Sequence, residues 1–142
     1  MYLFLLIAFW VPQHPESYSK NDILIVTSLS TPIDHITRLQ LKQLYLKKNE
    51  TFHKTKLTPV QLKDSHPLRI VFDQLVLGKH FNIQDYWIKQ KFLANEKPPI
   101  SVMNEAFVLI FIERNEGFIG YVNKGLEGEV KRLGLKVIEV TL

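Results

Sequence analysis

The chain of 142 residues contains no cysteine, which excludes disulfides and thiolate metal sites. Its five histidines have no partner at i, i+4, and no compact group of carboxylates accompanies them, so no metal site is predicted. The Gly-x-Ser-x-Gly pattern of many hydrolases is also missing, and nothing in the sequence indicates a catalytic triad assembled from distant residues. We therefore predict that the protein is not an enzyme and needs no cofactor.

Positive charge is missing from the first nineteen residues, because all 18 Lys and Arg lie at or after Lys20. Secretory signals usually carry such a charge, but the uninterrupted apolar run from Tyr2 to Val11 matches their apolar centre. The run is too short to span a bilayer, which takes about 20 residues. Ser17 and Ser19 have the size and spacing that suit a signal peptidase. We predict a signal peptide over residues 1–19 and export, with a buried strand or helix as the alternative.

The chain carries a formal net charge of +4 at pH 7. Such a surplus fits an ordinary surface, or an anionic ligand or partner. Between Lys42 and Lys56 basic residues are interleaved with aromatic ones, a pattern also seen in nucleic-acid-binding proteins. Since an exported protein seldom meets nucleic acid, we interpret this stretch as a solvated helix face and turn, and we predict no nucleic-acid partner.

Short apolar runs alternate with amphipathic stretches after residue 20, which predicts an α/β fold. The predicted strands are 22–27, 57–62, 118–122 and 136–140. The predicted helices begin at the T-x-x-Q pattern of Thr37 and Gln40, at Pro67 with an end at Gly78, at Asn82, and after Ser101, which we expect to cap a helix over 102–113. We expect Tyr86, Trp87 and Phe92 to be core residues because their spacing is helical.

The segment from Asp64 to Pro67 joins a predicted strand to the most clearly amphipathic helix of the chain. The first turn of a helix has unpaired N–H groups and a partial positive charge, so an anion can bind there. Ser65 would add a hydroxyl and Arg69 a positive charge. The alternative is that Ser65 or His66 only caps the helix, which is a common role for such residues.

Several segments, taken in order, carry a family resemblance. They are DILIVTSLST, LKQLYLKK, LTPVQLKDSHPLRIVFDQLVLG, YWIKQKF, GFIGYV and KVIEV. Together they resemble the short, single-domain relatives of the substrate-binding proteins of phosphate ABC transporters, over nearly all of residues 22–142. The resemblance implies a signal peptide and one periplasmic-binding-protein-like lobe (type 2-like) over residues 20–142, with a mixed sheet flanked by helices. It also implies a periplasmic location in a Gram-negative bacterium.

The longer members of this family close two lobes on a phosphate ion, and the chain resembles mainly the second lobe. The resemblance places Ser65 at the first hydroxyl of a phosphate-contacting Ser-Gly-Thr loop, whereas Gln61 replaces an Arg and Pro67 has neither a hydroxyl nor an N–H. Lys63 or Arg69 would supply the missing positive charge. The candidate ligand-binding residues are Lys63, Ser65, His66 and Arg69, with Ser28, Ser30 and Thr31 of the first loop as additions.

Two functions follow from these observations. The first is an exported solute-binding-like protein that binds phosphate or a related oxyanion for an ABC transporter or a membrane sensor. The alternative is a periplasmic interaction or adaptor protein that retained the lobe and lost the anion site. The replacements at Gln61 and Pro67 favour the alternative.

Overall fold

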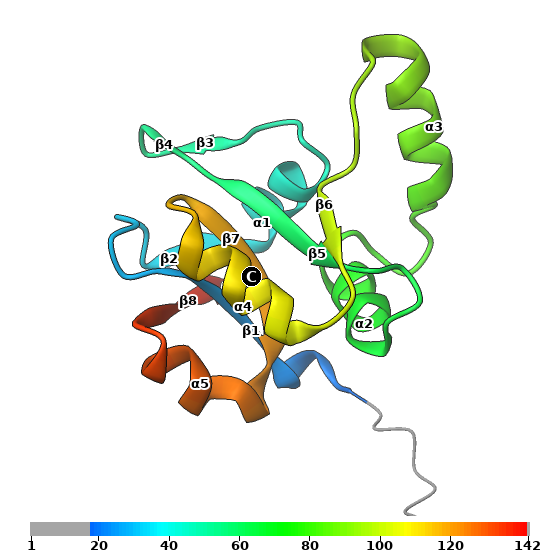
Figure 1. Cartoon of the computed structure of the whole chain (residues 1–142). Helices are drawn as coiled ribbons and strands as arrows, with labels where there is room; N and C mark the ends of the chain where they lie inside the picture. The colour runs from blue at the N-terminus through cyan, green and yellow to red at the C-terminus, as the bar shows by residue number, and fades with distance from the viewer. Residues whose placement is uncertain (1–17, 142) are drawn as a thin grey trace, which may run out of the picture.

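The computed structural model describes residues 18–141 (Figure 1). The strands are β1 (Ile23–Ser28), β2 (His35–Thr37), β3 (Thr51–Phe52), β4 (Thr55–Lys56), β5 (Thr58–Leu62), β6 (Ile100–Val102), β7 (Phe118–Asn123) and β8 (Leu135–Thr141). The helices are α1 (Arg38–Tyr45), α2 (Pro67–Val76), α3 (Ile83–Ala94), α4 (Glu105–Arg114) and α5 (Glu127–Arg132). The alternation of helices and strands that the sequence predicts is therefore confirmed.

Six of these strands form one mixed sheet in the order β2-β8-β1-β7-β5-β6. Strand β1 is antiparallel to both of its neighbours, β7 and β8, whereas β5 is parallel to both β7 and β6. The predicted mixed sheet flanked by helices is confirmed. Because β5, β6 and β7 run in the same direction, their carboxyl ends lie at one end of the sheet, and β1 ends at the opposite end.

An aromatic cluster fills the space between α1, α2 and the sheet. The rings of Phe72 and Tyr121 are stacked with their centroids 3.8 Å apart, and Tyr45 meets Phe72 edge-on at 4.8 Å. The Tyr45 hydroxyl donates to the carbonyl of Val60, and the Tyr121 hydroxyl accepts from the N–H of Leu62. Burial raises the pKa of both tyrosines, so they stay neutral. The cluster fixes the carboxyl end of β5 against α2.

The local signals place most helix ends correctly. Thr37 and Gln40 form the predicted capping box, with the Gln40 N–H donating to the Thr37 hydroxyl at 3.1 Å and the Thr37 N–H donating to the Gln40 side chain at 2.9 Å. Helix α2 stops before Gly78, whose φ of +103° suits glycine. The predicted cap at Ser101 is wrong, because Ser101 pairs with Gln61 inside the sheet and Asn104 caps α4 instead.

Helix α3 differs from the others because none of its residues is fully buried. Figure 1 shows it standing apart from the sheet, beyond the loop that follows α2. Tyr86 and Trp87 are half-buried, but Phe92 is 86% exposed, so its assignment to the core is wrong. Helical spacing showed that these residues share a helix, but the position of that helix relative to the sheet decides what covers them.

The predicted signal peptide lies outside the described residues except for Tyr18 and Ser19. Ser19 caps a short 3₁₀ helix, Lys20–Asp22, which leads into β1. Across residues 18–141, every helix is too short or too polar to cross a membrane. The same part of the chain contains no group of three or more His, Asp or Glu side chains that could hold a metal ion.

Candidate functional site

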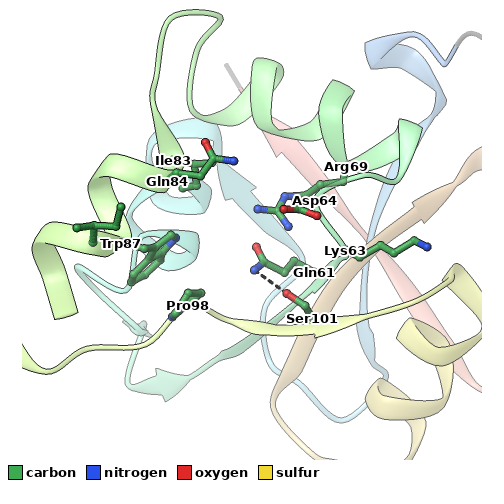
Figure 2. Close-up of a pocket in the computed structure, with 10 residues that line it drawn as sticks. Gln61, Lys63, Asp64, Arg69, Ile83, Gln84, Trp87, Pro98 and Ser101 are labelled. Carbon is green, nitrogen blue, oxygen red and sulfur yellow. Dashed lines mark hydrogen bonds between the residues drawn. The ribbon is translucent and has the colours of Figure 1, made fainter.

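A cavity of about 460 Å³ lies at the carboxyl end of β5, between α2, α3 and β6 (Figure 2). Figure 2 shows Trp87 and Pro98 on one side of it and Gln61, Arg69 and Ser101 on the other. The residues that line it are Gln61, Lys63, Asp64, Arg69, Ile83, Gln84, Trp87, Ile88, Pro98 and Ser101. Of the predicted ligand-binding residues, only Lys63 and Arg69 belong to this set.

Arg69 provides a fixed positive charge in the wall of the cavity. It lies in the first turn of α2, and its side chain folds back over the end of β5, where Nη1 donates to the carbonyl of Leu62 at 2.7 Å. Its Nε donates to Asp73, one helical turn further on, at 2.8 Å. Burial raises the pKa of the Asp73 carboxyl, and the nearby guanidinium opposes that rise. The guanidinium is therefore buried, paired and held in one orientation.

Gln61 connects the two strands beneath the cavity. Its side-chain amide nitrogen donates to the Ser101 hydroxyl at 3.0 Å and to the carbonyl of Pro99 at 3.3 Å. Both hydrogens of that nitrogen are thus used inside the protein. Gln61 therefore holds β6 against β5 and does not replace the charge of the Arg that the resemblance places at this position.

The junction between β5 and α2 has fewer free donors than the first turn of an ordinary helix. The Nδ1 atom of His66 accepts the N–H of Leu68 at 3.1 Å, which makes His66 the cap of α2. Pro67 occupies the first helical position and has no N–H. The capping role considered for His66 is confirmed, and neither His66 nor the exposed Ser65 lines the cavity.

The hydroxyls of the first loop lie at the other end of the sheet. Thr27, near the end of β1, pairs with Ile119, near the start of β7, whereas the cavity lies beyond the carboxyl end of β5. The Ser28 hydroxyl lies 3.1 Å from that of Ser30 and 2.9 Å from that of Thr31. These side chains bind one another, and the structure does not bring them together with the residues of the junction.

Trp87 is the residue that sequence reasoning missed. Among residues 18–141, its indole Nε1 is the one buried side-chain nitrogen or oxygen without a hydrogen-bond partner. Trp87 also lines the cavity. The helical spacing of Trp87 predicted a core residue, and the only signal of a second role was its polar N–H group. Gln84 and Ser101 were missed as well, because their polarity is ordinary for a surface.

The charges around the cavity nearly cancel. Lys63 and Arg69 are positive, Asp64 is negative, and Asp73 pairs with Arg69. Figure 2 shows the Lys63 side chain extending away from the wall formed by Trp87 and Pro98. Arg69 is therefore the cation that the fold holds in place, and Lys63 can only reach a ligand by changing its rotamer.

Comparison with known proteins finds similarity only at the level of structure. No family model matches the chain, and no curated protein matches its sequence. PstS from Borrelia burgdorferi superposes with a TM-score of 0.69 at 17% identity, over 84% of this chain and 47% of that protein. An ABC-type phosphate transport receptor from Vibrio cholerae gives a TM-score of 0.63 at 16% identity, over 84% of this chain and 46% of that one.

A protein from Clostridium perfringens solved with bound phosphate superposes with a TM-score of 0.64 at 17% identity, over 84% of this chain and 44% of that protein. The chain spans less than half the length of each of these neighbours. The Vibrio cholerae protein is a phosphate transport receptor, and the Clostridium perfringens protein is a putative phosphate ABC transporter substrate-binding protein. The chain thus has the α/β fold of a lobe of the phosphate ABC transporter substrate-binding proteins.

Proposed function

We propose that the chain is an exported, non-catalytic, solute-binding-like protein whose cavity binds phosphate or a related oxyanion, for an ABC transporter or a membrane sensor. The fold supports this proposal, since two of its neighbours are named as phosphate transport proteins. Their ligand and their transporter are assigned to this chain only by the proposal, because the chain spans under half of their length. We further propose a periplasmic location, which follows from the predicted signal peptide.

The unpartnered indole N–H of Trp87 is the observation that carries the proposal. Nearly all buried polar groups in proteins have a hydrogen-bond partner, so a buried donor without one calls for an explanation. After a rotation of the indole that uncovers Nε1, an oxyanion in the cavity would accept this N–H and face the guanidinium of Arg69 across the same space. The Ser101 hydroxyl already accepts from Gln61, so its own hydrogen is available to the ligand.

The affinity should be low. One fixed guanidinium, already paired with Asp73, faces the ligand, and the Asp64 carboxylate repels a second negative charge. A buried anion requires several charge-assisted hydrogen bonds to offset the loss of its hydration. We therefore expect a Kd on the order of 1 mM for phosphate, which corresponds to about −4 kcal/mol.

Calorimetric titration of the folded protein with phosphate tests the proposal. Replacing Trp87 by Phe keeps an aromatic ring in the wall but removes the N–H, and we expect it to weaken binding about tenfold, since a hydrogen bond to a charged group contributes about 1.5–3 kcal/mol. The control variant Ser65→Ala lies outside the cavity and should bind as the wild type does. The absence of heat at millimolar phosphate, or an unchanged affinity in Trp87→Phe, would overturn the proposal.

The second candidate is an interaction or adaptor protein that kept the lobe without the ligand. The occupied donors of Gln61 and the capped first turn of α2 favour it, because both remove groups that an anion would use. In this case a partner should be captured from a periplasmic extract equally well by the wild type and by a Ser65→Ala, Trp87→Phe double variant. Loss of capture in the double variant would contradict this candidate.

A further inference from the structure

Apolar side chains are exposed on the free part of α3. Ile88 is 56% exposed, Phe92 86% and Leu93 80%. Ile88 and Phe92 are one helical turn apart and share a face, and Leu93 follows directly, so we call these three residues the α3 tip. Figure 1 shows the helix projecting from the body of the molecule. An aromatic and two aliphatic side chains that project together into water usually mark a contact surface.

Lysines surround the α3 tip. Lys89, Lys91 and Lys97 are all exposed, and none of them forms an ion pair within residues 18–141. Glu96 is the only carboxylate in residues 88–97, and it is bound by Lys47 at 3.4 Å. The surface around the exposed apolar side chains is therefore positively charged.

We propose that the α3 tip is a membrane-contact element that docks on an anionic lipid surface. Phe92 and Leu93 enter the boundary between headgroups and acyl chains, while the flanking lysines remain at the level of the lipid phosphates. Exposed bulky apolar side chains next to lysines that form no ion pair are the combination through which interfacial segments contact anionic lipid, because the apolar groups enter the boundary and the lysines stay at the level of the phosphates. The proposal is independent of whether the cavity beside β5 binds an anion.

The small size of the α3 tip favours lipid over a protein partner. A stable protein interface buries about 800 Å² on each side and is depleted in lysine, whereas three side chains ringed by unpaired lysines provide neither property. A lipid surface needs no complementary shape and supplies a dense array of negative charge. The same lysines that would be poor interface residues are thus well suited to lipid phosphates.

The absence of cysteine allows a site-specific test with the full chain. Leu93→Cys carries an environment-sensitive fluorophore, and Leu39→Cys, at an apolar residue of α1 that is 64% exposed, is its matched control. Both are mixed with vesicles of phosphatidylcholine alone and with added phosphatidylglycerol. We expect a blue shift of the label at 93 on anionic vesicles only, reversed by high salt, and none at 39.

The position of the label separates contact by the α3 tip from any contact made by the apolar run Tyr2–Val11. In sedimentation, Phe92→Ser should weaken binding to anionic vesicles about tenfold through the loss of buried apolar area, whereas Leu39→Ser should not. A label at 93 that stays in water while the protein sediments would overturn the proposal. So would equal shifts at 93 and 39, equal binding of Phe92→Ser and wild type, or a shift at 93 that appears only with a protein partner.

Discussion

The two loops that the sequence grouped into one candidate site lie at opposite ends of the sheet and differ in what their polar groups bind. In the first loop the hydroxyls of Ser28, Ser30 and Thr31 bind one another. The ammonium group of Lys136 donates to the carbonyl of Thr31 in the same loop. At the other end a cavity remains, with the indole N–H of Trp87 buried and unpartnered. The polar side chains of the first loop are therefore paired with one another, whereas the cavity end keeps a buried donor without a partner.

The comparison shows that the number of polar residues is a poor guide to a binding site. Hydroxyls that are near one another in sequence satisfy each other at little cost and leave nothing for a ligand. At the cavity, by contrast, the donors come from α2, α3 and β6, and each is held by a different element. Arg69 is already paired with Asp73, and Ser101 already accepts from Gln61, so the N–H of Trp87 is the buried donor that stays without a partner among residues 18–141.

The largest expected effect is the loss of stability when an ion pair is broken, and it should differ between the pair beside the cavity and the pair at the opposite end of the sheet. Arg69→Met leaves Asp73 and the carbonyl of Leu62 without their donor. Removing one partner of a buried pair costs about 3–5 kcal/mol, and we expect the lower end, about 3 kcal/mol, because Asp73 keeps 25% of its side chain exposed. Lys136→Met breaks the pair with Asp34, which is 90% exposed, and also removes the donor to the carbonyl of Thr31, so we expect a smaller cost of about 1 kcal/mol.

Urea unfolding of both variants measures this difference in the free energy of unfolding. Phosphate calorimetry on the folded fraction should show binding lost in Arg69→Met and kept in Lys136→Met. Equal losses of stability in the two variants would contradict the distinction between a buried and an exposed pair.

The next effect concerns the first loop. Thr31→Val keeps the shape of a side chain that is almost fully buried but removes its hydroxyl, which lies 2.9 Å from that of Ser28 and 3.1 Å from that of Thr27. We expect a loss of about 1 kcal/mol in the free energy of unfolding and no change in phosphate affinity. Calorimetry that showed weaker phosphate binding in Thr31→Val would place this loop in the site after all.

An effect of similar size separates capping from binding at the start of α2. His66→Ala removes the acceptor for the N–H of Leu68 and should cost about 1 kcal/mol, the usual effect of losing a helix cap. Ser65→Ala next to it should change stability by less than about 0.5 kcal/mol, because Ser65 is exposed. Thermal unfolding monitored by circular dichroism measures both, and a larger loss in Ser65→Ala than in His66→Ala would reverse the assignment of the cap.

The smallest effect is the pH dependence that comes from Asp73, whose pKa is raised in the folded protein mainly by burial. The folded state then holds a proton that the unfolded state has already released, so the contribution of Asp73 to stability falls as pH rises from the ordinary aspartate pKa through the raised one. Asp73→Asn should lack this fall. Urea unfolding at pH values below and above these two pKa values tests this expectation. If the free energy of unfolding changes equally with pH in wild type and Asp73→Asn, Asp73 does not contribute to the pH dependence.

The sequence by itself determined the fold class, four helix starts or ends, and β1, β5, β7 and β8, whereas β2 and β6 of the same sheet were not predicted. The capping box of Thr37 and Gln40, the apolar face of α2 and the end at Gly78 are short-range signals, and each works through contacts within one or two turns. Together with the ordered family segments they predicted the mixed sheet that the structure contains. The exception, Ser101, failed because a parallel strand pairing between distant residues competes with a local cap.

Only the tertiary structure decided which residues line the cavity. The direction of β1 against β7 sent Ser28 and Ser65 to opposite ends of the sheet, and no property of either residue encodes that separation. Likewise, Trp87 and Phe92 share a helix and an aromatic character, but one lines a cavity and the other projects into water. The physical reason is that the burial of a side chain and its hydrogen-bond partners depend on how several elements pack together. Periodicity and capping, by contrast, depend on residues within one element.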